Sequence, residues 1–353
     1  MIKKYYCVMD KLAETYNLEA RKYKLKARNK EELNKWKKEL KSKLKELLGI
    51  TNIEKNDLKP KVIEIEELEG YRREKVILET ETNVFMPMYV LIPSDLRKGE
   101  KRPCIIAAHG HGCAAKDSTA GRIEIPAVKK GIDQYNCDYG LKLVKEGYIV
   151  FCNDARGFGE RREWMNQGDS EEDLIKNSCN AINNAAISLG KTLLGMMVWD
   201  LIRIVDYIET LDYCDEKNIG CIGFSGGGLQ AIWIAALEGR IKAAYVSGYF
   251  HSFKDALMKT NFCGCNFVPG LWKVIEMGDL GALVSPKALL IESGTKDPLN
   301  GERGMVDVEE QFGITKTAYS ILNTENKLYH HIFDGVHVFN GGKMRGFFKE
   351  YLK

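Results

Sequence analysis

The stretch Gly223-Phe224-Ser225-Gly226-Gly227 follows the pattern G-x-S-x-G, in which the serine can act as a nucleophile. The apolar run over 218–222 predicts a strand before it, and the run over 228–237 predicts a helix after it. A serine at such a turn exposes its hydroxyl, and the amide of Gly226 can face an oxyanion. A glycine-rich turn with an ordinary serine is the alternative. Catalysis therefore requires a base, an acid and a second oxyanion donor elsewhere in the chain.

The predicted base is His337, one of six histidines in the chain. It follows a strand-like run over 327–333, and a loop at that point can reach back over the carboxyl edge of a sheet. His330 and His331 lie within the run itself and are expected to pack on its two faces. His251 follows another expected strand and is predicted to line the substrate pocket.

The predicted acid is Asp297, in the loop after a buried strand over 288–292. A carboxylate there can accept the imidazole N–H of the base, fix its tautomer and stabilise the imidazolium. Asp334 is the rival because it lies three residues before His337. It also belongs to an Asp-Gly pair, which is common in ordinary turns. Asp297 is therefore favoured over Asp334.

The second oxyanion donor is expected in His109-Gly110-His111-Gly112, which follows an apolar run over 103–108. The amide of His111 or of Gly112 would complete the hole with Gly226. His109 and His111 could instead bind a metal, but they are two residues apart on a loop and no nearby carboxylate completes a ligand set. The prediction is that the protein needs no metal and no cofactor.

These motifs together resemble an α/β-hydrolase of the dienelactone-hydrolase-like and acetyl-xylan-esterase-like branch. The order Ser…Asp…His is the one found in α/β-hydrolases. The resemblance covers the chain from about residue 60 onward and includes the helical segment before it. Its matching pieces are His109-Gly110-His111-Gly112, 153–160, 195–200, 223–228, Lys296-Asp297-Pro298 and Gly335-Val336-His337. Dienelactone hydrolases carry a cysteine nucleophile, whereas this chain has Ser225, which argues for ordinary ester chemistry.

The composition agrees with that of a soluble enzyme, and the partner expected from the motifs is a small-molecule ester substrate. The 353 residues have a net charge of +3, too small to indicate a nucleic-acid partner. No export signal or membrane-length apolar run is evident, so a cytoplasmic location without a membrane partner is expected. The ten cysteines are expected to be free thiols, and Cys263-Gly264-Cys265 is interpreted as loop structure near the pocket. The sequence leaves a homo-oligomer open.

The chain divides into a helical extension over 1–59 and an α/β-hydrolase catalytic domain over 60–353. Three antiparallel strands are expected first, and strand-helix alternation then indicates a mainly parallel, doubly wound sheet of about eight strands. The expected strands are 61–68, 73–79, 84–92, 103–108, 147–152, 218–223, 243–247, 287–292 and 327–333.

Two cap-like insertions, 113–140 and 158–192, fall outside the expected sheet. Insertions of this kind commonly cover the pocket of such a fold, although plain surface loops are the alternative. The predicted substrate-binding residues are His109, Trp164 and His251. Asp154 and Arg156 are expected to form a structural pair, and Asp200 is expected to pair with Arg203.

The resemblance implies a serine carboxylesterase that cleaves short, acetyl-type esters of a sugar or small metabolite through an acyl-enzyme. Ser225 would attack the ester carbonyl after His337 takes its proton. A serine peptidase of the prolyl-oligopeptidase type shares this arrangement, but residues 1–59 are too few for its propeller domain. A non-enzymatic, hydrolase-like binding protein is the other alternative.

Overall fold

The computed structural model describes residues 6–260 and 262–353. Within those residues nine strands form one sheet, in the order β1-β2-β3-β5-β4-β6-β7-β8-β9. The predicted α/β-hydrolase fold is confirmed, with nine strands where about eight were expected. The strands are β1 (Lys61–Leu68), β2 (Tyr71–Glu81), β3 (Val84–Pro93), β4 (Arg102–Ala108), β5 (Ile149–Asn153), β6 (Cys214–Phe224), β7 (Ile241–Ser247), β8 (Ala288–Gly294) and β9 (Leu328–Phe333).

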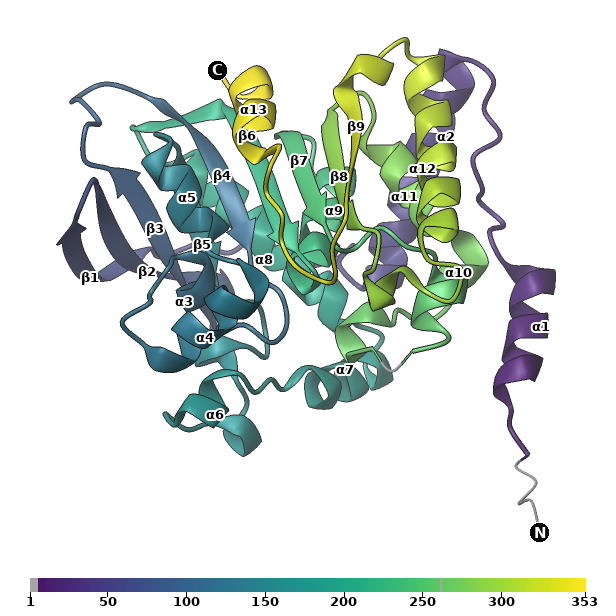
Figure 1. Ribbon diagram of the computed structural model, residues 1–353, viewed down its shortest axis with the longest axis horizontal. Coiled ribbons are helices and arrows are strands. Elements are labelled where there is room, and N and C mark those ends of the chain that lie inside the picture. Colours follow the sequence, from purple (N-terminus) through teal and green to yellow (C-terminus); the bar gives the residue numbers. More distant parts are fainter. Residues whose placement is uncertain (1–5, 261) are drawn as a thin grey trace.

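The first three strands pair antiparallel, β3 pairs antiparallel with β5, and the remaining pairs are parallel. Helices cover both faces of this twisted sheet (Figure 1). They are α1 (Met9–Glu19), α2 (Lys30–Leu48), α3 (Ala115–Thr119), α4 (Pro126–Tyr135), α5 (Tyr139–Lys145), α6 (Glu171–Leu174), α7 (Cys179–Ser188), α8 (Leu193–Ile208), α9 (Gly226–Leu237), α10 (Leu271–Val274), α11 (Met277–Val284), α12 (Met305–Ile321) and α13 (Met344–Tyr351).

The two faces of the sheet bury separate hydrophobic clusters. Alternation along β4 shows this directly, because Cys104 and Ile106 pack with α8, α9 and α11 whereas Ile105 packs with α5 and α13. A strand that buries side chains on both faces has a continuously apolar sequence. This pattern is typical of parallel sheets that are covered by helices on each side. The parallel strands β4, β6, β7 and β8 thus form the buried centre of the molecule.

The amino-terminal segment contains two helices rather than one continuous helical stretch. An irregular segment over 20–29 separates α1 from α2, and its backbone pairs with residues 272–274. Asn29 caps α2 by accepting a hydrogen bond from the Glu32 amide at 3.0 Å. The apolar stripe of α2 joins the core beside α8, while α1 stands at the outer side of the molecule (Figure 1). The buried members of that stripe are Leu33, Leu40, Leu44 and Leu48.

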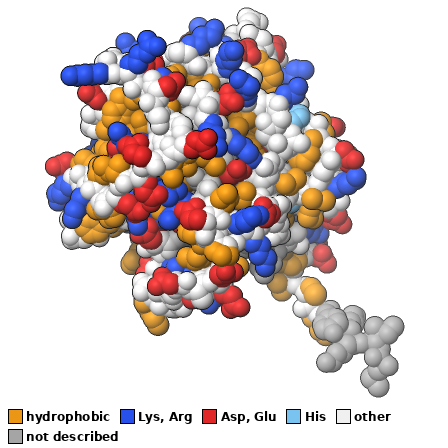
Figure 2. Space-filling view, turned by 60° about the vertical axis from the view of Figure 1, so that its left-hand side comes forward, with side chains coloured by type: hydrophobic (Ala, Val, Ile, Leu, Met, Phe, Trp, Pro, Cys, Tyr) orange, Lys and Arg blue, Asp and Glu red, His pale blue; other side chains and the backbone are white. Residues whose placement is uncertain are grey.

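Charged side chains of both signs are interspersed over the surface shown in Figure 2. This mixture agrees with the small net charge of the chain. Among the described residues, no single helix is long and apolar enough to cross a membrane. The helices α7 and α8 reach such a length only as a pair, across a bend of 101°.

A buried ion network fixes the segment that follows β5. Asp200, on α8, accepts hydrogen bonds from Arg156 at 2.8 and 2.9 Å and from Arg161 at 2.7 Å. Burial alone would raise the pKa of Asp200, but the two guanidinium groups hold it below its usual value. The expected pairs therefore differ from the observed ones. Asp154 pairs with Lys116 at 2.8 Å, and Arg203 pairs with Asp206 three residues further along α8.

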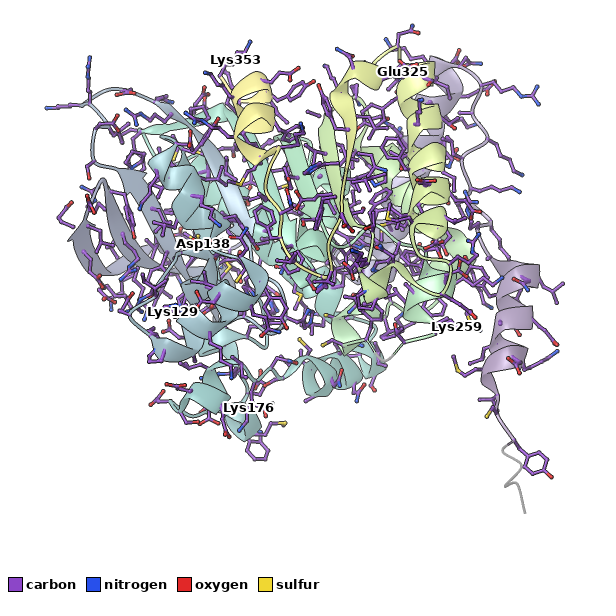
Figure 3. All side chains as sticks on the ribbon, in the orientation of Figure 1. Lys129, Asp138, Lys176, Lys259, Glu325 and Lys353 are labelled. Carbon is purple, nitrogen blue, oxygen red and sulfur yellow. The ribbon has the colours of Figure 1, made fainter. Side chains whose placement is uncertain are left out.

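Asp200→Asn should lower the free energy of unfolding by about 3 kcal/mol or more, because it removes the carboxylate that pairs with the buried Arg161 and one of the two that pair with Arg156. The matched control is Asp133→Asn, which breaks an exposed pair with Lys129 and should cost about 0–1 kcal/mol. Lys129 lies at the periphery of the molecule, on α4 (Figure 3). Urea unfolding of both variants measures the difference. An equal decrease in the free energy of unfolding for both would show that the buried network stabilises the fold no more than an exposed ion pair does.

Candidate active site

Ser225 occupies a strained turn between β6 and α9. Its backbone has φ 56° and ψ −121°, a conformation that non-glycine residues rarely adopt. The amide of Ser225 donates to the carbonyl oxygen of Ser247, at the end of β7, over 2.9 Å. Residues held in such regions cost about 1–3 kcal/mol each and need support from their surroundings. The geometry matches the turn that the G-x-S-x-G pattern predicts.

The glycines around Ser225 permit close backbone approach. A Cβ atom at Gly223 would overlap the backbone of Gly227, and one at Gly227 would overlap the carbonyl group of Ala108. Strand β6, helix α9 and the end of β4 therefore meet with no room for a side chain between them. This crowding is the physical reason for glycine at these positions.

The proposed base and acid lie together. The Nδ1 atom of His337 is 2.7 Å from Oδ2 of Asp297, and the carboxylate is buried. Its other oxygen accepts a hydrogen bond from the Leu299 amide at 2.8 Å, which fixes the carboxylate plane. Asp334, the rival, points elsewhere. It pairs with Lys296 at 2.8 Å and leaves 75% of its side chain exposed.

Contacts with the turn that carries Ser225 orient the imidazole of His337. Its ring centroid lies 4.6 Å from that of Phe224, the residue before Ser225. A Cβ atom at Gly248 would lie 3.2 Å from Cε1 of His337. Because Asp297 engages Nδ1, the Nε2 atom is the nitrogen left to exchange a proton with a nucleophile.

Glu292 anchors the loop that carries His337, a role that sequence reasoning missed. This buried carboxylate, on β8, accepts hydrogen bonds from the amides of Asn340 and Gly341, each at 3.0 Å. It also accepts from the Ser247 hydroxyl at 2.8 Å. The available signal was an acidic residue within an otherwise apolar strand, which must find partners when buried.

The loop after β4, residues 109–112, packs directly onto the turn that carries Ser225. A Cβ atom at Gly110 would lie 2.6 Å from the Phe224 carbonyl oxygen and 3.3 Å from Cβ of Ser225. The backbone nitrogen of His111 lies 3.4 Å from the position that a Cβ atom of Gly226 would take. Gly226 begins α9, so its amide has no acceptor within the helix. The structure thus brings the backbone of His111 close to Gly226, the residue after Ser225.

His109 supports this loop from beneath. It is buried, its Nε2 accepts from the Ala155 amide at 3.0 Å, and its Nδ1 lies 3.0 Å from the Gly110 carbonyl oxygen. Burial lowers the pKa of His109 and favours the neutral ring. With both nitrogens engaged by the protein, His109 has no free polar atom for a substrate, which differs from its expected substrate-binding role.

The other two expected substrate-binding residues differ sharply in environment. Trp164 leaves 78% of its surface exposed, so its side chain does not form a closed apolar roof. His251 is buried against the rings of Tyr249 and Phe262, and neither of its ring nitrogens has a hydrogen-bond partner. Burial lowers the pKa of His251 to about 4, so the ring is neutral near pH 7.

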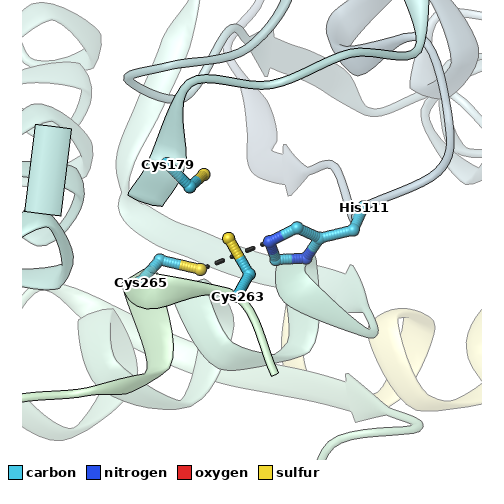
Figure 4. A group of neighbouring side chains, drawn as sticks. All are labelled: His111, Cys179, Cys263 and Cys265. Atoms are coloured by element: carbon cyan, nitrogen blue, oxygen red, sulfur yellow. Dashed lines mark hydrogen bonds between the residues drawn. The ribbon is translucent and has the colours of Figure 1, made fainter. Parts of the chain in front are cut away.

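His111 also meets three cysteines that the sequence placed in no common site. Its Nε2 atom lies 3.3 Å from Sγ of Cys265, and Cys179 and Cys263 complete the group (Figure 4). Sequence spacing pairs His111 only with His109, and Cys263 only with Cys265. The four residues come from three separate segments, so their proximity does not follow from sequence spacing.

Comparison with known proteins identifies the family. Residues 5–334 match the model of the Abhydrolase family, and the chain therefore belongs to that family. It is similar to "Putative hydrolase YtaP" of Bacillus subtilis (strain 168), with 28% identity over 256 residues, which are 70% of this chain and 78% of that protein.

Two solved structures share the fold. A crystal structure described as a "putative acetyl xylan esterase" from Bacteroides fragilis NCTC 9343 matches with a TM-score of 0.74 and 18% identity, covering 95% of this chain and 84% of that chain. A glucuronoyl esterase from Solibacter usitatus matches with a TM-score of 0.65 and 13% identity, covering 94% and 96%. At these identities the likeness concerns the fold alone.

Asp297→Asn should lower kcat for an activated ester such as p-nitrophenyl acetate about a thousandfold or more, because the amide cannot hold the required tautomer of His337. Asp334→Asn removes the same charge from an exposed side chain beside the same loop and should change kcat less than about threefold. Steady-state kinetics of the two variants decide the assignment. A larger loss at Asp334 would make that residue the acid.

Proposed function

We propose that this protein is a serine carboxylesterase with Ser225 as nucleophile, His337 as base and Asp297 as the acid that orients the base. The observation that carries the proposal is the partly buried 2.7 Å hydrogen bond between His337 and Asp297, formed beside the strained turn of Ser225. The ring of His337 also packs against Phe224, the residue before Ser225, and its Nε2 has no hydrogen-bond partner among the described residues.

In the proposed reaction, Nε2 of His337 takes the hydroxyl proton of Ser225 as Oγ attacks the ester carbonyl carbon. The carbonyl oxygen becomes an oxyanion, which the amides of Gly226 and His111 stabilise, or the amide of Gly112 in place of the latter. The C–O bond to the alcohol then breaks, and the imidazolium gives its proton to the departing oxygen. Ser225 is left acylated.

Water completes the cycle by the same route. His337 takes a proton from the water, whose oxygen attacks the acyl carbon and forms a second oxyanion at the same donors. The bond to Oγ breaks, Ser225 regains its proton from His337, and the carboxylic acid leaves. Each step uses only side chains and amides of the chain itself.

Short acyl groups on a sugar or small metabolite are the proposed substrates. The two solved structures of similar fold are named as a putative acetyl xylan esterase and a glucuronoyl esterase, which supports this class. His251 provides a second argument, since a neutral, buried imidazole with free nitrogens can both donate and accept a hydrogen bond. We propose that it binds a hydroxyl group of the alcohol part of the substrate.

Ser225→Ala should lower kcat for p-nitrophenyl acetate by roughly four to six decades while the fold survives. The wild-type protein should react covalently with a fluorophosphonate probe at Ser225, located by peptide mass spectrometry. Ser247, whose hydroxyl bonds to Glu292, is a matched control site and should remain unlabelled. A Ser225→Ala variant that keeps more than about a tenth of the activity would reject the proposed nucleophile. Aminoacyl amides cleaved faster than acetyl esters would instead favour a peptidase.

His251→Phe tests the proposed substrate contact, because phenylalanine keeps a ring of similar shape and removes both nitrogens. We expect kcat/KM for an acetylated sugar to fall about tenfold or more, the scale of an unpaired substrate hydroxyl. Activity on p-nitrophenyl acetate, which lacks sugar hydroxyls, should change little. A parallel loss on both substrates would indicate a packing role for His251 rather than recognition.

A further inference from the structure

Four side chains that carry metal-binding atoms lie close together beside Ser225. One of them, His111, belongs to the loop over 109–112, which is called the oxyanion loop below. Nε2 of His111 and the Sγ atoms of Cys179, Cys263 and Cys265 all lie within 4.8 Å of one another. In Figure 4 the donor atoms of His111, Cys263 and Cys265 face one another, and Cys179 lies next to them. His111 comes from the loop after β4, Cys179 begins α7, and the other two cysteines flank Gly264 in the segment after β7.

We propose that these four residues bind a zinc ion. Three thiolates and one imidazole form a ligand set that zinc takes up in closed, tetrahedral structural sites. With Zn–S bonds of about 2.3 Å, tetrahedral geometry places sulfur atoms about 3.8 Å apart. The four donor atoms already approach these separations, and Nε2 of His111 lies 3.3 Å from Sγ of Cys265. Small side-chain rotations would therefore suffice to close the site.

The chemistry of the donors selects the ion. Sulfur and imidazole nitrogen favour zinc among the available divalent cations, whereas calcium and magnesium require oxygen ligands. Binding converts three thiols into thiolates, so three protons leave to solvent as Zn²⁺ enters, and the ligated centre carries one negative charge. No electron is transferred, and no oxidant or reductant is needed.

Neighbouring groups hold the ligands in place. The side-chain amide of Asn266 lies 3.6 Å from Sγ of Cys265 and can donate to a thiolate there. Asn180, in the first turn of α7, accepts from the Gly264 amide at 2.7 Å and so ties the two cysteine-bearing segments together. The ring of His111 packs edge-on against Phe158 with centroids 5.1 Å apart. Its Nδ1 atom fills the space where Gly226 lacks a side chain.

A disulfide explains this arrangement less completely than a metal ion does. One disulfide would use two of the sulfurs and leave the third cysteine and the histidine unexplained. Another thiol pair in the chain, Cys113 and Cys137, shows the difference. Its sulfurs lie 3.0 Å apart, but no histidine or further cysteine joins them to make a metal-binding group among the described residues.

The proposed ion has a structural role. With four protein ligands, a zinc centre has no open position for a substrate or a water, so it does not act as a Lewis acid. It would instead join the oxyanion loop to α7 and to the segment after β7. The backbone amide of His111 is a proposed oxyanion donor, so the ion would fix that donor through the side chain of the same residue.

The first test measures metal content. The full-length protein, purified under reducing conditions without an affinity metal and incubated with zinc, should retain about one zinc per chain by mass spectrometry of the metal. Cys265→Ser should lower this to below about a tenth. Cys137→Ala, which removes an equally buried thiol, should retain the full amount. Ser225→Ala should retain it too, so metal binding is distinguished from the proposed esterase function.

A second measurement uses the wild-type chain and remains informative if Cys265→Ser fails to fold. Cys263 is partly exposed, so iodoacetamide should alkylate it after chelation but not in the zinc-loaded protein, a difference of about tenfold or more in rate. The exposed Cys7 should react equally in both states and serves as the internal control. Absence of bound zinc, equal alkylation of Cys263 in both states, or full zinc in Cys265→Ser would overturn the proposal.

Discussion

The positive φ of Ser225 is the constraint on which the rest of the site depends. A turn of this kind is maintained only if the elements around it leave no alternative, and here β4, β6 and α9 pack on it at glycines that admit no Cβ atom. The hydrogen bond from Ser225 to β7 adds a backbone anchor from a neighbouring strand. The packed strands and helix therefore hold Ser225 in this turn, although the residue itself is largely buried.

The loops that complete the site are positioned by buried polar groups rather than by the sheet ladder. His109 holds the oxyanion loop to the segment after β5, and Glu292 holds the loop of His337 to the end of β8. His109 and Glu292 are buried, and both accept hydrogen bonds from backbone amides of these loops. If a loop moved, a buried polar atom would lose its partner. Removing one partner leaves a buried polar atom unpaired and lowers the free energy of unfolding. Such contacts therefore hold each loop in one conformation.

The parts of this structure that depend on local patterns could be predicted from the sequence. Ser225, the strand before it and the helix after it are adjacent in the chain, and the nine strands lie close to their expected ranges. The choice of Asp297 over Asp334 came from its position after a strand, and the structure places Asp297 beside His337. By contrast, the partners of Asp200 and Glu292 lie far away in sequence, and no periodicity or motif encodes them. The burial of His109 and the exposure of Trp164 also depend on tertiary packing.

The cluster of His111 with Cys179, Cys263 and Cys265 shows why spacing alone is a weak guide to metal sites. Zinc motifs are recognised when two ligands are close in sequence and a second pair follows, whereas here only Cys263 and Cys265 are close. The segments that meet at this cluster are long loops and a short helix, which have no sheet ladder to hold them together. A four-ligand joint between such segments stabilises all of them at once, because each ligand restricts the others. The loop of His111 would gain the most from the proposed ion, because oxyanion donors must be in place before the substrate arrives.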